Sequence, residues 1–575
     1  MITPRLGSAA VLAAFGVLLL VGIGCGQNAA PSLPAVFKAH VQADSGRHAD
    51  AVRQAYHDSE WQPIWLTPSG PTEQARALLR QICDAPHEGV SREQYQAQAH
   101  IEQLERLYVS SGSDALSADS AGYASLAATD VALTRTFLRY ADHLTTGRVN
   151  PNEVQGSWNV EQDRAASVEI LRQAQAQGVS ETLDQVSARH IDYRPLRDAL
   201  QQYRLIADTG GWPTLPRDIT LSHGDIGPHV LQLRQRLAMT DDLKATRARS
   251  EQAETAVYDI AVVRAVRHFQ KRHGLAETGT VDADTRSALN VSAHKRVRQL
   301  ALNLERHRWL PEDLGQDFVF VNIMDFELTA YRDGSKTMEM PVVVGEEDKQ
   351  TTAFADTMRY VVFGPYWNIP REIAINEILP KVQADSTYLA QNNYEVLNAA
   401  GNVVDRSLLS EEALNRYEVR LREKPGAGNS LGLVKFMFPN DHDIYLHDTP
   451  ADHLFQRPKR TFSHGCVRVK EPAAFASHVL PEKWTEAQVR EAMNAGERKR
   501  VSLRQRLPVY LVYLTAWAGP GGAVHFRRDL YGHDDALEAA LDEPNPRPHA
   551  CAHLEDVFQK MKENDSNGLF ATFSG

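Results

Sequence analysis

The hydrophobic period of the chain changes near Asp317, and this change limits the fold more than any other feature of the sequence. Before it, apolar residues recur at helical spacing; after it come short runs rich in β-branched and aromatic residues. These runs are residues 318–323, 340–345, 358–363 and 509–514. Asp333-Gly334 is typical of a tight hairpin turn. We therefore predict a mainly antiparallel β-sandwich or barrel over residues 317–520.

The part of the chain before Asp317 is predicted to be helical. A chain of 575 residues exceeds one hydrophobic core, so several domains are expected. We predict a helical domain over residues 50–217 and a small three-helix domain over residues 218–292. A helix within the linker 293–316 has a wide apolar face, so we expect it to pack back on the N-terminal helices. The fold class is therefore multidomain α+β.

A segment with helical periodicity and many polar residues interrupts the β-rich part at about residues 372–430. Residues 372–382 and 408–422 are each predicted to form a helix, and the turn at Pro425-Gly426 ends the second. An insertion of this size before a strand of the site is a candidate lid.

The chemistry concentrates in Ser463-His464-Gly465-Cys466 and in His447 upstream. A thiol with a pKa of about 8.5 is mostly protonated at neutral pH, so a nucleophilic Cys466 needs a base, which His447 can supply. Gly465 lets the backbone turn tightly, so the N–H groups of Gly465 and Cys466 can face an oxyanion. His464 and Ser463 can hold this loop. Together these residues predict acyl transfer; as isolated residues they would be a structural thiol and loop histidines.

His447 followed by Ser463-His464-Gly465-Cys466 closely resembles the signature of the L,D-transpeptidases with a YkuD-type catalytic domain. Residues 269–275 resemble the type 1 peptidoglycan-binding motif, and residues 144–149 and 193–196 resemble the helical scaffold of the large Gram-negative members. The resemblance implies that Cys466 forms a thioester with a tetrapeptide stem, releases D-Ala and gives 3→3 cross-links. It also implies a capping insertion, acylation by carbapenems, and no cofactor or metal.

Four further residues have expected roles around this pair. The backbone carbonyl of Asp448 can orient the His447 ring. Arg468, which stands where many members of the family carry Asn, can hold a substrate carboxylate, although a structural ion pair is an alternative. Tyr445 and Trp367 can line the pocket for substrate, or belong to the core.

Three other classes of protein compete with this interpretation. A papain-like or related wall-peptide hydrolase also uses Cys and His, but those families place Cys before His along the chain. An L,D-carboxypeptidase, in which water accepts the acyl group, would use the same residues as the transpeptidase. A zinc peptidase would have to use His442, Asp443, His447 and His464, whose spacing matches no metalloprotease motif. A silent wall-binding scaffold would not need the Cys and His pair. The sequence leaves open whether another stem, a lipoprotein or water accepts the acyl group.

The N-terminus predicts export. Arg5, an apolar run over residues 9–23 and small residues around Cys25 form a signal over residues 1–25, which places the mature protein in the periplasm. Lipidation of Cys25, ordinary cleavage and an uncleaved membrane anchor stay open. Residues 26–49, with Pro31 and Pro34, are expected to form a flexible tether.

Charge and cysteine content exclude other partners. A formal net charge of −11 without a long basic run argues against nucleic acid. The four cysteines, Cys25, Cys83, Cys466 and Cys551, form no Cys-x-x-Cys pair, so neither zinc nor a disulfide framework is expected, and Cys83 is interpreted as a buried apolar residue. The C-terminal extension, residues 521–575, has no assigned role.

Overall fold

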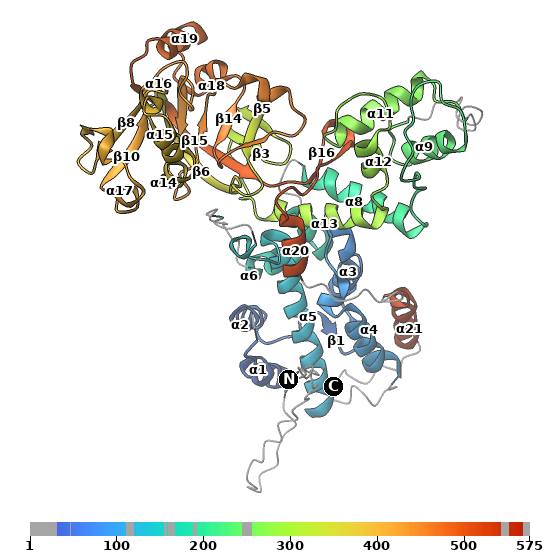
Figure 1. Cartoon of the computed structure of the whole chain (residues 1–575). Helices are drawn as coiled ribbons and strands as arrows, with labels where there is room; N and C mark the ends of the chain where they lie inside the picture. The colour runs from blue at the N-terminus through green and yellow to red at the C-terminus, as the bar shows by residue number, and fades with distance from the viewer. Residues whose placement is uncertain are drawn as a thin grey trace, which may run out of the picture.

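The computed structural model describes residues 32–46, 48–110, 120–154, 158, 167–187, 192–243, 256–541 and 551–566. Three bodies are visible in Figure 1: a helical body at the bottom, a β-rich body at the upper left and a small helical unit at the upper right. The predicted export signal, with Cys25, lies outside the described residues.

The lower body is built around one long helix, α5. Its elements are α1 (Leu33–Gln42), α2 (Ala49–Asp58), β1 (Leu66–Thr67), β2 (Gly70–Pro71), α3 (Glu73–Cys83), α4 (Ala97–Glu105), α5 (Ser120–Thr146), α6 (Ser167–Gln177) and α7 (Val179–Ser187). Tyr56 and Phe137 are fully buried in its core. The Asp130 carboxylate on α5 accepts the backbone N–H groups of Ile64, Trp65 and Leu66, which ties the segment before β1 to this helix.

The expected tether between residues 26 and 49 is wrong for its described part. Residues 33–42 form α1, and Phe37 and Val41 lie fully buried in the core of the lower body. Pro34 stands in the first turn of α1, where proline lacks only an N–H that would have no helical partner. A proline that suggested a linker therefore begins a helix.

Two helices join the lower body to the β-rich body. α8 (Tyr193–Asp208) and α13 (Ala293–Arg308) share a core with the hairpin of β16 (Ala516–Ala518) and β17 (Val524–Phe526). Leu196 of α8 and Leu300 of α13 are fully buried there. This confirms that the helix after the small unit returns to pack on the N-terminal part of the chain.

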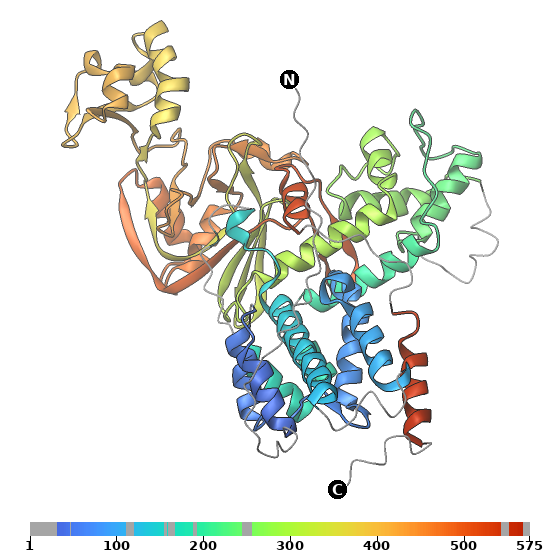
Figure 2. The same ribbon diagram turned by 90° about the horizontal axis from the view of Figure 1, so that it is seen from below.

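The small unit is helical, as predicted. Its helices α9 (Pro228–Ala238), α11 (Ile260–Arg272) and α12 (Ala283–Leu289) enclose a core that contains Leu233, Val266 and Phe269. It lies on the opposite side of the molecule from the insertion of the β-rich body, as both views show (Figures 1 and 2).

The β-rich body is one sheet that closes on itself. Its strands are β3 (Phe318–Asn322), β4 (Glu327–Arg332), β5 (Ser335–Gly345), β6 (Phe354–Phe363), β11 (Val434–Met437), β12 (Leu446–His447), β13 (Thr461–Ser463), β14 (Val467–Val469) and β15 (Lys499–Val512). They lie in the order β13-β5-β14-β12-β11-β6-β15-β3-β4, and β4 also pairs with β5. Only β3–β15, β12–β14 and β5–β13 are parallel among these pairs of described strands. Helices α18 (Pro472–Val479) and α19 (Glu486–Asn494) add Phe475 and Val489 to its core.

The predicted strands and the hairpin turn are confirmed. Each of the four predicted runs overlaps a strand, β3, β5, β6 or β15. Arg332 pairs with Ser335 across the turn, and Asp333 and Gly334 have φ values of 50° and 70°. Two successive left-handed residues match the twist of the flanking strands.

The insertion contains a sheet as well as helices. Its elements are β7 (Trp367–Asn368), α14 (Arg371–Ile373), a π-helical turn (Ala374–Ile378), α15 (Leu379–Ala384), α16 (Tyr388–Gln391), β8 (Tyr394–Asn398), β9 (Val403–Val404), α17 (Glu411–Asn415) and β10 (Val419–Glu423). The first predicted helix is confirmed, but the second is wrong beyond α17. Val419, Leu421 and Glu423 are buried at alternate positions, the period of a strand. Figure 2 shows the insertion projecting from the barrel.

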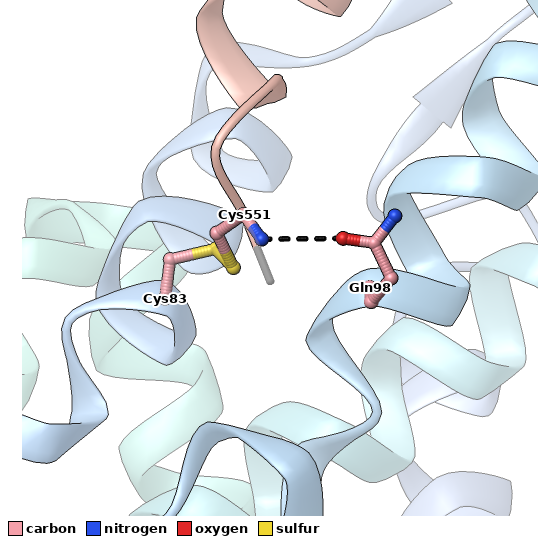
Figure 3. The surroundings of a disulfide bond; sticks show 3 residues. All are labelled: Cys83, Gln98 and Cys551. Atoms are coloured by element: carbon pink, nitrogen blue, oxygen red, sulfur yellow. Dashed lines mark hydrogen bonds between the residues drawn. A yellow bond between two sulfur atoms is a disulfide. The ribbon is translucent and has the colours of Figure 1, made fainter. Parts of the chain in front are cut away.

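The C-terminal part corrects the interpretation of the cysteines. Cys83 at the end of α3 forms a disulfide with Cys551, 468 residues away (Figure 3). The Cys551 N–H donates to Gln98 Oε1 at 3.2 Å. After it, α21 (Leu554–Ser566) buries Val557 and Phe558 in the core of the lower body, whereas α20 (His533–Leu541) packs beside α13. Cys83 is thus a cross-link, and the expectation of no disulfide is wrong.

Across the described ranges, none of the helices combines the length and apolar character that a membrane span requires.

Candidate active site

The site is one face of three adjacent strands, β11, β12 and β14. Lys435 pairs with His447, and His447 pairs with Arg468 in parallel register. The neighbouring residues on the same strands, such as Leu446 and Val467, point into the barrel core. Because side chains alternate along a strand, the other face receives a separate set. That set is Lys435, Tyr445, His447, Cys466 and Arg468.

His447 is held in one orientation by its own loop. Its Nδ1 lies 2.5 Å from the carbonyl oxygen of Asp448, which accepts a hydrogen bond from it, so Nε2 is the ring atom free to accept a proton. The Asp448 carboxylate accepts the N–H groups of Leu433, at 2.8 Å, and Thr449, at 2.7 Å. A Cβ at Gly432, whose φ is +61°, would meet the Asp448 side chain at 2.4 Å, so glycine is required here.

The imidazole of His447 is neutral at rest. Its side chain is buried, with 4% of the residue exposed. Burial, together with the nearby charges of Arg468 and Lys435, lowers the pKa of His447 to about 3. The ring can therefore accept a proton only as another charge develops beside it.

Cys466 lies between the strands and the loop before β12. Its Sγ is 3.7 Å from the carbonyl oxygen of Asp443, and the residue is half-buried. Burial raises the pKa of the Cys466 thiol, while hydrogen bonds from Tyr445 and the charges of Lys435 and Arg468 act in the opposite direction. The thiol is thus protonated at neutral pH, but its surroundings favour the thiolate once it forms.

The loop before Cys466 is closed by side-chain hydrogen bonds. Ser463 Oγ donates to the Cys466 carbonyl oxygen at 2.5 Å and accepts the Gly465 N–H at 3.2 Å. Thr351 Oγ1 donates to the Gly465 carbonyl oxygen at 2.8 Å. Gly465 has a φ of +107°, which favours glycine. The structure therefore corrects one expectation: the Gly465 N–H is bound by Ser463, and of the two N–H groups expected to face an oxyanion, that of Cys466 is left.

His464 contacts the insertion. Its Nε2 lies 2.6 Å from Glu377 Oε1 and 2.8 Å from Lys349 Nζ. Glu377 belongs to the π-helical turn after α14. Burial acts to raise the pKa of Glu377, but His464 and Lys349 hold it below its usual value. We call His464, Glu377 and Lys349 the clasp, because they join the catalytic loop to the insertion.

Two cations and two aromatic rings complete this face. Lys435 Nζ lies 3.5 Å from the centre of the Tyr445 ring, and burial lowers the pKa of Lys435 to about 8. The Nε of Arg468 is buried without a hydrogen-bond partner, and burial lowers the pKa of its guanidinium. Interaction with Trp367 acts to lower the pKa of Tyr445, although burial raises it overall. The structure thus brings Tyr445 and Trp367 together at the site.

Three family models match separate parts of the chain. They are the "Scaffold domain" over residues 50–200, the "Putative peptidoglycan binding domain" over residues 227–289 and the "L,D-transpeptidase catalytic domain" over residues 316–491. The last range contains both His447 and Cys466. Residues 316–491 are therefore similar to an L,D-transpeptidase catalytic domain.

The chain is also similar to a curated protein from Haemophilus influenzae, named "Putative L,D-transpeptidase". That protein is 36% identical over 246 residues, which are 42% of this chain and 50% of the relative. The chain therefore spans about half the length of the curated relative it matches. The crystal structure of an L,D-transpeptidase from Xylanimonas cellulosilytica, 16% identical, covers 52% of this chain and 98% of that one at a TM-score of 0.17. So low a score carries no argument, and the fold rests on the strands described above.

Sequence reasoning missed three residues of the transpeptidase site: Lys435, Glu377 and Lys349. Lys435 had a usable signal, because it is the one charged residue in the run Leu433-Val434-Lys435-Phe436 and so marks the outer face of that strand. Glu377 and Lys349 come from the insertion and from the loop after β5, and no local pattern joins either of them to His464.

The zinc alternative finds no geometric support among its four residues. Nε2 of His464 is held by Glu377 and Lys349 of the clasp. Within the described ranges, no three His, Cys, Asp or Glu side chains lie close enough together to hold a metal ion.

Proposed function

We propose that this chain is a peptidoglycan L,D-transpeptidase that acts through a thioester on Cys466. The sulfur attacks the carbonyl carbon between the L-centre of stem residue three and the terminal D-Ala. The C–N bond breaks, D-Ala leaves, and a C–S bond holds the acyl group. The side-chain amine of a neighbouring stem's diamino acid then attacks the thioester and gives a 3→3 cross-link.

One observation carries the proposal: His447 and Cys466 lie on the face of two parallel strands that points away from the barrel core, and a backbone carbonyl fixes the His447 ring. This arrangement leaves Nε2 of a neutral imidazole to accept the thiol proton. A structural thiol beside a core histidine would not need the buried charges of Lys435 and Arg468 next to it.

The protonation states suggest how the proton moves. Both Cys466 and His447 are neutral at rest, so His447 takes the proton as the sulfur attacks rather than before. The imidazolium then gives that proton to the leaving D-Ala nitrogen, and the neutral ring later accepts one from the attacking amine. The Cys466 N–H is the proposed donor to the oxyanion.

The other residues of the face supply binding. Arg468 has a buried Nε without a partner and is the proposed ligand of a stem carboxylate. Tyr445 and Trp367 lie where the insertion meets β12, and we assign them to the walls of the donor site. The described part of the small helical unit gives no evidence of what it binds; its family match supports a wall-binding role.

The experiment that tests the proposal uses the purified mature chain and a disaccharide-tetrapeptide. Mass spectrometry should find released D-Ala and a cross-linked dimer, neither of which the Cys466→Ala variant produces. Tripeptide without dimer would identify an L,D-carboxypeptidase, in which water accepts the acyl group. Release of D-Ala by Cys466→Ala at the wild-type rate would refute the thioester.

Inhibition and location follow from the same proposal. We expect a carbapenem to acylate Cys466, since its strained ring presents a carbonyl to the thiol, and an intact mass should show one adduct. We place the mature protein in the periplasm, either free or tethered through its N-terminus. The Cys83–Cys551 disulfide supports an oxidising compartment.

A further inference from the structure

The lower helical body contains a cavity of about 290 Å³ that has no part in the chemistry above. One wall is a stripe of α5, and the others come from α4 and from the segments that precede α2 and α4. These elements lie in the lower half of Figure 1, whereas β14 lies in the upper part. The cavity is therefore separate from Cys466.

The walls carry positive charge and no acidic side chain. Arg135 and Arg139 stand one turn apart on α5 and both line the cavity. Arg135 is neutralised, because its Nε donates to Asp44 Oδ2 at 2.9 Å, and the Asp44 side chain is only 1% exposed. Arg139 donates to the carbonyl oxygen of Gln94, and among the described residues no carboxylate pairs with it. One guanidinium charge is left uncompensated.

The groups around Arg139 are fixed rather than mobile. Its guanidinium carbon lies 5.6 Å from the centre of the Tyr95 ring. His100, which is 6% exposed, bonds Thr136 at 2.8 Å, and burial lowers the pKa of His100 to about 4, so this pair adds no charge. The fork of Arg139 is thus oriented before any ligand arrives, which lowers the entropy lost on binding.

The backbone on two walls adopts an unfavourable conformation. His48 and Gln96 line the cavity with φ values of 92° and 53°, in the left-handed region that side chains other than glycine rarely adopt. Such residues persist where the surrounding structure enforces them, and they are frequent in binding sites.

We propose that this cavity binds the carboxylate of a ligand one or two residues long, such as the end of a short peptide. A single uncompensated cation matches a monoanion better than a doubly charged phosphate. The planar fork of Arg139 suits a carboxylate, and the Tyr95 ring gives an apolar substituent a surface. A cavity of about 290 Å³ lies at the small end of the range for ligand sites. If the proposed function holds, the stem peptides of the wall supply such carboxylates; the binding itself does not require Cys466.

The test is calorimetric titration of the full mature chain with N-acetyl-D-alanine, free D-alanine and inorganic phosphate. Arg139→Gln should weaken binding of N-acetyl-D-alanine at least about tenfold, because a charge-assisted hydrogen bond is lost. Arg139→Lys keeps the charge but loses the planar fork, so its affinity for N-acetyl-D-alanine should lie between those of the wild type and Arg139→Gln. Arg106→Gln removes an exposed arginine of the same body outside the cavity and should change nothing. Arg468→Gln should also leave this binding intact.

Each outcome decides the matter. Binding of N-acetyl-D-alanine alone indicates that the ligand is the end of a peptide. Binding of both alanine compounds indicates that a free amino acid can also supply the carboxylate. The proposal is overturned if folded Arg139→Gln or, should that variant not fold, Arg139→Lys binds like the wild type. The proposal is also overturned if phosphate binds more tightly than the alanine compounds, or if Arg468→Gln no longer binds N-acetyl-D-alanine. The absence of heat with either carboxylate would overturn it as well. D-Ala release from a soluble tetrapeptide by Arg139→Gln should match the wild type, so this test and that of the thioester fail independently.

Discussion

Arg308 on helix α13 and two cations around Cys466 are all withdrawn from water, but Arg308 is paired and, among the described residues, those two are not. Arg308 of α13 donates to the Tyr193 hydroxyl at 2.7 Å and to Glu305 Oε2 at 3.2 Å. Burial acts to lower the pKa of Arg308, but Tyr193 and Glu305 raise it overall. Lys435 and Arg468 are half-buried, yet burial prevails there and lowers the pKa of both.

The difference separates structural from functional charge. Burial of an ion that is paired and hydrogen-bonded costs little free energy, because its partners replace the lost water. Burial of an unpaired ion costs several kcal/mol, because nothing replaces its hydration. The fold satisfies the cation of α13 and leaves those beside Cys466 for a negative group that arrives later. Under the proposed function, that group is the thiolate, the oxyanion or a substrate carboxylate. Substitutions at the two places should therefore have opposite consequences for stability and activity.

The largest effect should come from the nucleophile. Cys466→Ala removes the atom proposed to form the thioester, so D-Ala release should vanish while the melting temperature stays close to that of the wild type. Cys83→Ala and Cys551→Ala serve as controls: they remove the disulfide, cost about 2–4 kcal/mol of stability, and should keep most activity at a temperature where the chain is folded. D-Ala release by liquid chromatography and thermal melts give both readouts. Loss of activity in the folded Cys83→Ala and Cys551→Ala variants would contradict the division into structural and functional residues.

The second-largest effect is expected at Arg308, the paired cation of α13. Arg308→Met removes the nearer of the two arginines that pair with the buried Glu305, while Arg148 stays beside it, so unfolding should become easier by up to about 3–5 kcal/mol. Denaturant titration measures this loss, and D-Ala release per folded molecule should be unchanged. Arg204→Met, which removes a bond to the Pro86 carbonyl oxygen nearby, is the milder comparison. A stable but inactive Arg308→Met would show that α13 serves the chemistry directly.

The functional cation should behave in the opposite way. Arg468→Met is expected to lower kcat/KM for the tetrapeptide by about 10- to 100-fold, the worth of a hydrogen bond to a charged group. Stability should stay the same or rise, because an unpaired buried charge is removed. Steady-state kinetics and melting curves on one preparation test this. If the melting temperature falls along with kcat/KM, Arg468 is a structural ion and its role in binding is wrong.

Lys435 should tune the thiol in a pH-dependent way. Its charge favours the thiolate below its own pKa of about 8 and is lost above it. Lys435→Met should therefore slow alkylation of Cys466 by iodoacetamide about tenfold at pH of about 7, and the difference should shrink as pH rises past about 8. Lys499→Met, which removes an exposed lysine over Trp484, is the control. Alkylation is followed by intact mass. A wild-type rate that levels off below neutral pH would instead indicate a resting thiolate and imidazolium.

How much of this follows from sequence depends on the distance between the partners. Strands and the turn at Asp333-Gly334 are local patterns and were predictable. Cys466 and His447, proposed as nucleophile and base, could be picked out because nearby glycine and polar residues mark them. The register that places Lys435 beside His447 is set by pairing of whole strands, so no local pattern contains it.

The failures have the same origin. The Cys83–Cys551 pair joins residues 468 positions apart, and single cysteines carry no sign of their partner. Residues 408–422 were expected to be one helix because α17 and β10 adjoin without a clear break. β10 is a strand because β8 and β7 pair with it on its two sides. Pro34 suggested a linker, although it stands in the first turn of a helix whose buried face is set by α5.

The smallest effect should come from the clasp, which joins the catalytic loop to the insertion. The His464–Glu377 contact is partly exposed, so Glu377→Gln should cost stability by less than about 1 kcal/mol. The thioester must survive until an amine arrives, and a cover that excludes water favours transfer over hydrolysis. We therefore expect Glu377→Gln to lower cross-link yield a few-fold and to raise the share of tripeptide.

Shortening the insertion between residues 372 and 428, with β7 and β11 kept, should act more strongly in the same direction. Both changes leave Cys466 and His447 in place, so acylation by a small β-lactam should fall less than cross-linking of the bulky stem. Glu372→Gln, an exposed change on α14 outside the clasp, is the matched control. If the insertion only buttresses the barrel, acylation and cross-linking will fall together with the melting temperature. That parallel loss would show that the insertion, like α13, belongs to the structural part of the molecule.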